Sequence, residues 1–220
     1  MDDTTLALAG VIAAAFVGFI VIFNLATAAV GALLGASVDK IQFGLGPSVR
    51  LARLGGMDIR ATPLMLGGSV MFRPRADGSW ASWPVQAIVA LVGPFGVIAA
   101  AALVLGQRVV DAALSTWPDM IAIVTSPRPA DVFGALTALI AARGHMDAVA
   151  TVMTKFAAFN LAPLPIFAGG AFLLALIEGL IGAARRNALM QRLAAPSLIV
   201  MLVWCVAFLW RAFAGAFANA

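Results

Sequence analysis

Few side chains of this chain are of types that perform chemistry. Its 220 residues include one histidine, His145, and one cysteine, Cys205. The only acidic residue inside an apolar helical stretch is Glu178. A catalytic zinc ion needs three protein ligands, mostly histidine together with carboxylate or thiolate. No combination of these residues supplies them, so we expect no metal, no cofactor and no catalytic residue.

Two polar residues, Asn24 and Thr27, stand three apart in a long apolar stretch and therefore share one face of a helix. Polar groups in such a setting usually hydrogen-bond to a neighbouring helix or to a local carbonyl group. They could also bind a partner's helix, and both roles stay open.

A second polar position, Asn160, begins the segment Asn-Leu-Ala-Pro-Leu-Pro that ends at Pro165. Two prolines remove two helical hydrogen-bond donors and favour an extended backbone. Asn160 could hold this extended backbone or that of a bound peptide. Glu178 lies one or two helical turns from Arg185 and Arg186, which predicts a structural ion pair.

The composition indicates an integral membrane protein with a single domain. Hydrophobic residues make up 63% of the chain and charged residues only 11%, whereas soluble proteins have about a quarter of their residues charged. The net charge of +4 does not indicate nucleic-acid binding, because no basic helix or interleaved aromatic residues accompany it. The expected partner is the lipid bilayer.

The elements that must position these residues follow from the apolar stretches. A membrane-spanning helix needs about 20 apolar residues, and four stretches qualify: residues 6–37, 82–106, 148–184 and 195–218, the third broken at Asn160–Pro165. Residues 38–79 are rich in glycine and proline and alternate in polarity, which predicts two to four short membrane-associated strands. Residues 107–147 are expected to form a loop, with a short amphipathic helix at 130–143. The predicted fold is therefore an all-α polytopic membrane protein with a small β-region.

The basic residues predict the orientation. The segment 38–77 and the link at 185–192 both carry an excess of arginine, which favours the cytoplasmic side. The N-terminus and C-terminus are then expected outside. The high alanine and arginine content suggests a bacterial protein of the inner membrane.

Four segments, in order, resemble the site-2 protease family of intramembrane zinc metalloproteases. They are Val38–Pro47, Thr62–Val70, Pro84–Val97 and Phe159–Gly170. The last is the most specific, because it is similar to the family signature Asn-x-x-Pro-x-Pro-x-x-Asp-Gly-Gly. The resemblance implies a broken helix beside a substrate cleft, with zinc held by a His-Glu-x-x-His motif and by the aspartate of that signature.

This sequence departs from the family pattern at each zinc-binding position. Aligned without gaps, the His-Glu-x-x-His positions fall on the segment from Phe23 to Thr27, with Asn24 at the glutamate, and the aspartate position falls on Ala168. Phenylalanine and alanine have no atoms that coordinate zinc. The resemblance therefore implies an inactive homologue, not an enzyme.

Three hypotheses for the function follow. The first is a pseudoprotease, a scaffold that binds transmembrane segments of partner proteins without cutting them. The second is a structural subunit of a larger membrane complex, its groove filled by Phe23 and Phe167. The third is an active protease with an unrecognised site. In the first hypothesis the resemblance implies a binding groove formed by Asn24, Thr27, Met65, Asn160, Pro163, Pro165, Gly169 and Gly170.

Overall fold

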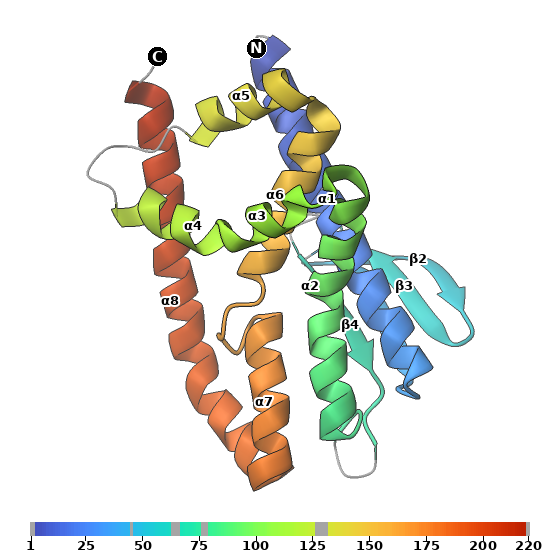
Figure 1. Ribbon diagram of the computed structural model, residues 1–220. Helices are drawn as coiled ribbons and strands as arrows, with labels where there is room; N and C mark the ends of the chain where they lie inside the picture. The colour runs from blue at the N-terminus through green and yellow to red at the C-terminus, as the bar shows by residue number, and fades with distance from the viewer. Residues whose placement is uncertain (1–2, 45, 63–66, 76–78, 126–131, 219–220) are drawn as a thin grey trace.

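Long helices run side by side in the computed structural model, and a small sheet lies next to the first of them (Figure 1). The structure describes residues 3–44, 46–62, 67–75, 79–125 and 132–218. The helical elements are α1 (Asp3–Leu33), α2 (Trp83–Leu105), α3 (Arg108–Leu114), α4 (Thr116–Thr125), α5 (Val132–Arg143), α6 (His145–Phe159), α7 (Ala168–Ile181) and α8 (Ala183–Ala218). The strands are β1 (Val38–Phe43), β2 (Val49–Leu54), β3 (Met57–Ala61) and β4 (Gly68–Phe72).

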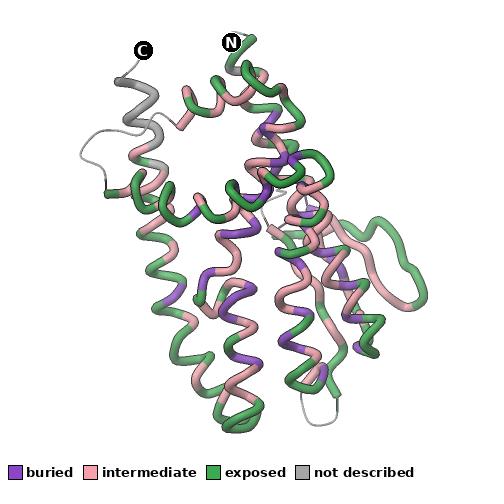
Figure 2. The backbone as a smooth tube through the Cα atoms, in the orientation of Figure 1, coloured by how far each residue is buried: buried purple, intermediate pink, exposed green. Residues whose placement is uncertain are grey.

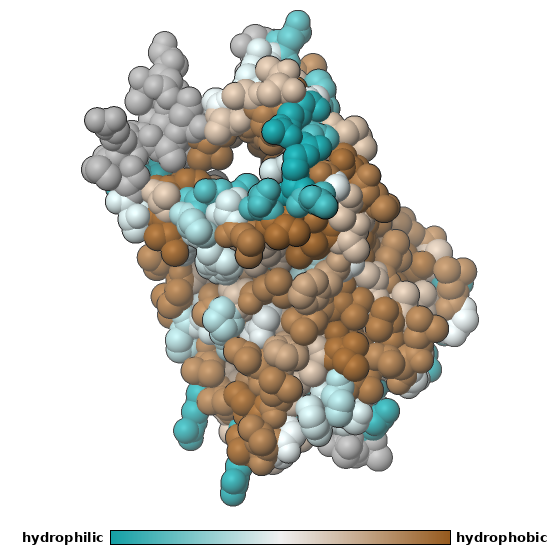
Figure 3. Space-filling view, viewed as in Figure 1, coloured by the Kyte–Doolittle hydropathy of each residue, from teal (hydrophilic) through white to brown (hydrophobic). Residues whose placement is uncertain are grey.

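Three of the described helices are long and apolar enough to cross a membrane. They contain the spans Leu6–Leu33, Trp83–Leu105 and Ala183–Phe208. A broad apolar band crosses the visible face of the molecule, and hydrophilic residues gather above it and at the lower ends of the helices (Figure 3). The chain therefore has the composition and helix lengths of a membrane protein.

The boundaries of two predicted spans need correction. The first helix ends at Leu33 and not at residue 37, because Gly35 adopts a φ of +81° that terminates it. The last helix begins at Ala183 instead of residue 195, so the arginine-rich link expected as a loop is its first three turns. The link is rich in alanine, leucine and arginine, which favour helix.

The third predicted span is divided, as expected, between Phe159 and Ala168. The two flanking helices, α6 and α7, have 15 and 14 residues, each shorter than the roughly 20 that one span needs. They follow one another down the molecule in Figure 1. The third of the four expected spans is thus not a single helix in the described chain.

The region predicted as a loop, residues 107–147, is mostly helical. It contains α3, α4, α5 and the start of α6. Pro118 lies in the first turn of α4, where a missing N–H costs nothing. The expected amphipathic helix corresponds to α5, but it is not amphipathic, because its apolar residues surround the axis and none is buried.

The strands form one four-stranded sheet in the order β2-β3-β1-β4, within the two to four that were predicted. β1 pairs with β3 in parallel and with β4 antiparallel. One face packs on α1, where Ile41 is 2% exposed and the Phe72 ring lies against Gly31.

Small residues hold the helices together. α2 packs against α1, α6 and α7, and the core includes Ala15, Val97, Met153 and Ala157. Buried positions follow these four helices, whereas α8 is largely exposed (Figure 2). Pro94 lies inside α2 without ending it, as a transmembrane helix tolerates when neighbouring helices satisfy the freed carbonyl group.

Candidate functional site

The candidate site is a cavity of about 380 Å³ between α1, β4, α2 and α7, next to the break between α6 and α7. Six of the predicted zinc-ligand and groove positions line it: Phe23, Asn24, Thr27, Asn160, Pro165 and Ala168. Met65 lies outside the described residues. Pro163, Gly169 and Gly170 are not among the described lining residues.

The α1 side of the cavity carries the two polar residues of the apolar helix. The Thr27 hydroxyl donates a hydrogen bond of 2.8 Å to the Phe23 carbonyl, and the Asn24 Nδ2 donates one of 2.7 Å to the Ile20 carbonyl. Local carbonyl groups thus satisfy the donors. Asn24 is only 2% exposed, and its Oδ1 atom has no hydrogen-bond partner among the described residues. One buried acceptor is therefore left at the cavity wall.

Phe23 fixes the distance between α1 and α2. A Cβ atom at Gly93 would lie 2.7 Å from the Phe23 ring, which is closer than real contacts allow. Gly93 therefore allows α1 and α2 to pack closely, because it leaves room for the large Phe23 ring opposite it.

The α7 side is held by Asn160. The Ala168 N–H donates to its Oδ1 atom at 3.2 Å, and the Gly169 N–H donates to its carbonyl oxygen at 3.1 Å. Of the two roles left open for Asn160, the structure contains the first: the side chain holds the chain's own backbone. These bonds satisfy two of the free N–H groups at the start of α7.

The glycines that follow have a packing role. A Cβ atom at Gly169 would overlap the Leu161 carbonyl group, and one at Gly170 would overlap that of Leu164. α7 therefore begins in direct backbone contact with the extended segment. This contact places Ala168 at the cavity wall and fixes the course of the break.

A polar cluster stands at the lower side of the cavity. The Gln86 Nε2 donates to Glu178 Oε1 at 3.3 Å and to the Ala81 carbonyl at 2.8 Å. Arg186 lies 3.7 Å from Glu178 and donates to Gln86 Oε1 at 3.4 Å. The predicted pair between Glu178 and Arg186 is confirmed. Sequence reasoning missed Gln86, although a polar residue inside an apolar helix was a usable signal.

The sheet contributes one edge to the cavity. β4 is the last strand in the sheet order, and Gly68, Ser69 and Val70 line the cavity. Among the described strands only β1 pairs with β4. An edge strand offers backbone N–H and C=O groups to another extended segment.

Zinc, which the family resemblance implies, does not fit this donor set. Phe23 and Ala168 offer no donor atoms, and the Thr27 hydroxyl already binds a carbonyl group. Among the residues that the structure describes, no three His, Cys, Asp or Glu side chains come together. His145 is exposed at the start of α6, and Cys205 lies on α8. These described groups therefore do not form a zinc site.

Comparisons with known proteins add no relative. The chain matches no protein-family model and no curated protein sequence.

Proposed function

We propose that this chain is a catalytically inactive, site-2-protease-like membrane protein that holds transmembrane segments of partner proteins. One observation carries the proposal. The positions at which the resemblance implies zinc ligands, Phe23, Thr27 and Ala168, come from two helices far apart in sequence and yet line one cavity. A cavity at the place where the resemblance implies a substrate cleft, lined by residues that do not bind zinc, supports holding a segment without cutting it.

The cavity walls suit an unwound partner segment. Extended backbone in a membrane must satisfy its hydrogen bonds within protein, because lipid offers none. The edge of β4 supplies a row of such groups, and strand addition is an established mode of peptide recognition. Asn24 lines the same cavity, and its buried, unpaired Oδ1 would become a further acceptor for a partner's N–H group once the side chain turns toward the cavity.

The same proposal includes four membrane crossings, with α6 and α7 together forming the third. Both termini then lie on one side of the membrane, outside, and the sheet and the start of α8 on the cytoplasmic side. The high alanine and arginine content supports a bacterial inner membrane as the location. The broken crossing places the cavity within the bilayer, where a partner's helix could reach it from the side.

Site-specific photocrosslinking in native membranes tests the scaffold. A photoreactive residue replaces Ala90, which lines the cavity, and Leu103 on the same helix, which is 89% exposed, serves as the matched control. We expect a discrete crosslinked membrane protein from Ala90 and none of that mass from Leu103. Equal patterns from both positions would contradict the scaffold.

Metal analysis distinguishes the scaffold from the third hypothesis, an active protease with an unrecognised site. The purified chain should carry far less than one zinc ion per molecule, and a chelator should leave its thermal stability unchanged. Stoichiometric zinc together with chelator-sensitive cleavage of a helix in lipid would overturn the assignment as inactive.

A structural subunit of a larger complex is the second candidate, favoured by the rings of Phe23 and Phe167 in the cavity. The Phe167 ring packs edge-to-face on Phe159 with centroids 5.0 Å apart, which narrows the groove. Purification in mild detergent distinguishes the two. A partner of fixed stoichiometry that still binds after Ala90→Trp fills the cavity favours the subunit, whereas loss of the partner favours the scaffold.

A further inference from the structure

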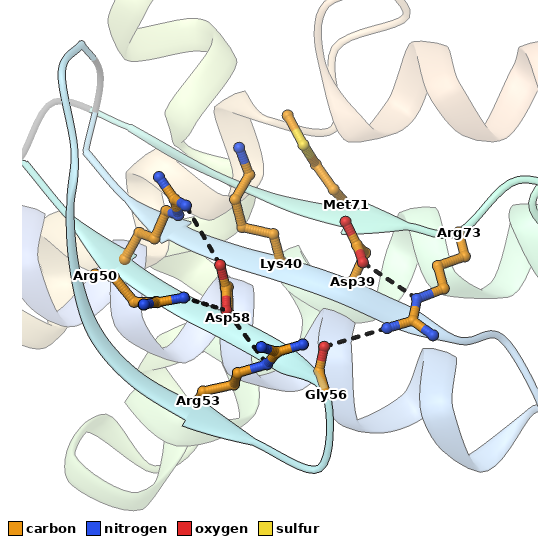
Figure 4. A pocket seen from close by; sticks show the side chains of 9 residues that line it. Asp39, Lys40, Arg50, Arg53, Gly56, Asp58, Met71 and Arg73 are labelled. Carbon is orange, nitrogen blue, oxygen red and sulfur yellow. Dashed lines mark hydrogen bonds and ion pairs between the residues drawn. The ribbon is translucent and has the colours of Figure 1, made fainter.

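The face of the sheet that turns away from α1 carries a cluster of charged side chains (Figure 4). They surround a depression of about 390 Å³. Five basic residues and two acidic ones line it: Lys40, Arg50, Arg53, Arg60 and Arg73 against Asp39 and Asp58. The depression therefore has three more positive than negative side chains. We call it the basic face.

Two irregularities in the strands concentrate these charges on one side. In a regular strand, neighbouring side chains point to opposite faces. The pairing of β1 with β4 shifts between Val38 and Lys40, so that both Asp39 and Lys40 line the basic face. The pairing of β2 with β3 shifts between Arg50 and Ala52. This second bulge brings Arg50 and Arg53, three apart, to the same side.

The acidic residues do not neutralise this face. Asp58 is shared by Arg50 at 3.8 Å, Arg53 at 3.9 Å and Arg60 at 3.3 Å. Asp39 pairs with Arg73 at 3.1 Å, and Lys40 has no ion pair within the described part of the chain. The Arg60 Nε atom is buried and has no hydrogen-bond partner among the described residues. The ammonium group of Lys40 is therefore left without a described carboxylate partner and can bind an anion.

The position of the sheet indicates what covers this face. A Cβ atom at Gly68 would lie 3.2 Å from Ile20, and one at Gly31 would lie 2.5 Å from Phe72. The sheet therefore runs beside α1 from Ile20 to Gly31, which is part of the apolar span Leu6–Leu33. Charged groups next to hydrocarbon are costly unless polar groups solvate them. Lipid headgroups are the polar groups at the edge of a bilayer.

The edge strand β2 points to the same occupant. Val49, Leu51 and Leu54 are 68%, 64% and 59% exposed, and they alternate with the arginines of the basic face. Apolar side chains beside basic ones are typical of surfaces that lie in a membrane interface. These exposed apolar side chains favour a lipid over an acidic segment of a protein, because an acidic segment would bind the arginines without needing apolar neighbours.

We propose that the basic face binds the phosphate of an anionic lipid headgroup. Guanidinium groups bind phosphate oxygens in a bidentate way, and four arginines line this depression. The site is separate from the cavity, and it does not depend on the scaffold role. A lipid bound here would hold the sheet against the membrane surface beside α1.

Native mass spectrometry of the purified full chain tests this. The protein is titrated in neutral detergent with phosphatidylglycerol or with phosphatidylcholine. We expect retained phosphatidylglycerol and little phosphatidylcholine. The double substitution Arg50→Gln with Arg53→Gln should weaken phosphatidylglycerol binding about 25-fold, since each basic residue near a membrane surface contributes about fivefold.

The control removes the same charge elsewhere. Arg185→Gln with Arg192→Gln alters two exposed arginines of α8 and should leave binding unchanged. Lys40→Gln, which orphans no described acidic partner, should weaken binding about fivefold. Circular dichroism confirms that each variant folds.

Three results would overturn the proposal. The first is a lack of selectivity, seen either as equal retention of both lipids or as an equal loss in the control variant. The second is displacement of phosphatidylglycerol by an equal concentration of inorganic phosphate, which would identify a site for free anions. The third is release of a co-purifying protein by Arg50→Gln with Arg53→Gln while lipid retention stays the same, which would identify a protein interface.

Discussion

At the scale of single residues, the unsatisfied acceptor of Asn24 stands out. A buried polar atom without a hydrogen bond destabilises the folded state by about 1–3 kcal/mol, and Asn24 is almost fully buried. An unsatisfied buried atom in a native protein calls for an explanation, such as local strain or a functional role. In the scaffold, it is the acceptor that a partner's backbone would use.

Asn24→Leu tests this role. Leucine has a similar volume and removes the unpaired acceptor, so we expect the free energy of unfolding to be unchanged or higher by about 1 kcal/mol. Crosslinking of a partner from Ala90 should fall in the same variant. Thermal unfolding and crosslinking are measured on one preparation. A less stable variant that still captures the partner would contradict the assignment.

Gly170 is the residue at which the break is most sensitive to substitution. Since a Cβ atom there would overlap the Leu164 carbonyl group, Gly170→Ala should destabilise the protein by about 1–3 kcal/mol. Gly10→Ala is the matched control, because nothing lies within 4 Å of its Cβ position. Alanine at this helical site should stabilise the chain slightly. Chemical unfolding monitored by tryptophan fluorescence would compare them.

At the scale of elements, α7 depends on a side chain outside it. Asn160 accepts from the Ala168 N–H across the break, and losing such a cap costs about 1 kcal/mol. Asn160→Ala should lower stability by this amount and speed amide exchange at 168–170. Asn160→Asp should keep most of the stability, because its carboxylate also accepts. Exchange that rises equally along α6 would show general unfolding instead.

Helices and strands were predicted correctly where the sequence signal was local, and wrongly where the prediction rested on the length of an apolar stretch. The broken third stretch and the β-region were predictable, because Pro163, Pro165 and the alternating residues of 38–79 act locally. The region 107–147 was not, because its polar and apolar residues are mixed, and such a composition occurs in short helices as well as in loops. Hydrophobic length also mispredicted α8, whose first turns are polar but continue the helix.

The candidate site was predictable only in part. The polar residues Asn24, Thr27 and Asn160 could be identified from the sequence because each interrupts an apolar stretch. Gln86 was overlooked, and its partners Glu178 and Arg186 approach it only after α2, α7 and α8 pack. The basic face could not be predicted from the sequence. Two bulges determine which side chains lie on this face, and a strictly alternating strand pattern does not include bulges.

At the scale of the whole molecule, the number of crossings determines where the ends lie. The N-terminus and C-terminus lie at the same end of the structure (Figure 1). Single cysteines at Thr4 and Met146 should therefore react with an impermeant reagent from one side of the membrane, and those at Gly55 and Asn187 from the other. Cys205→Ala provides the background. Labelling of Thr4 and Asn187 from the same side would contradict four crossings.

The sparse attachment of α8 has a consequence for how the molecule can be altered. Only 6% of its most apolar stretch is buried, against 33% for α2, and Gly182, with a φ of +84°, joins it to α7. Of the described α8 residues, Arg186 alone lines the cavity. The part of α8 beyond Arg192 therefore tolerates wide exchange: a different apolar helix grafted there should leave the cavity lining intact, provided that it keeps the ring of Trp204, which stacks on Phe159.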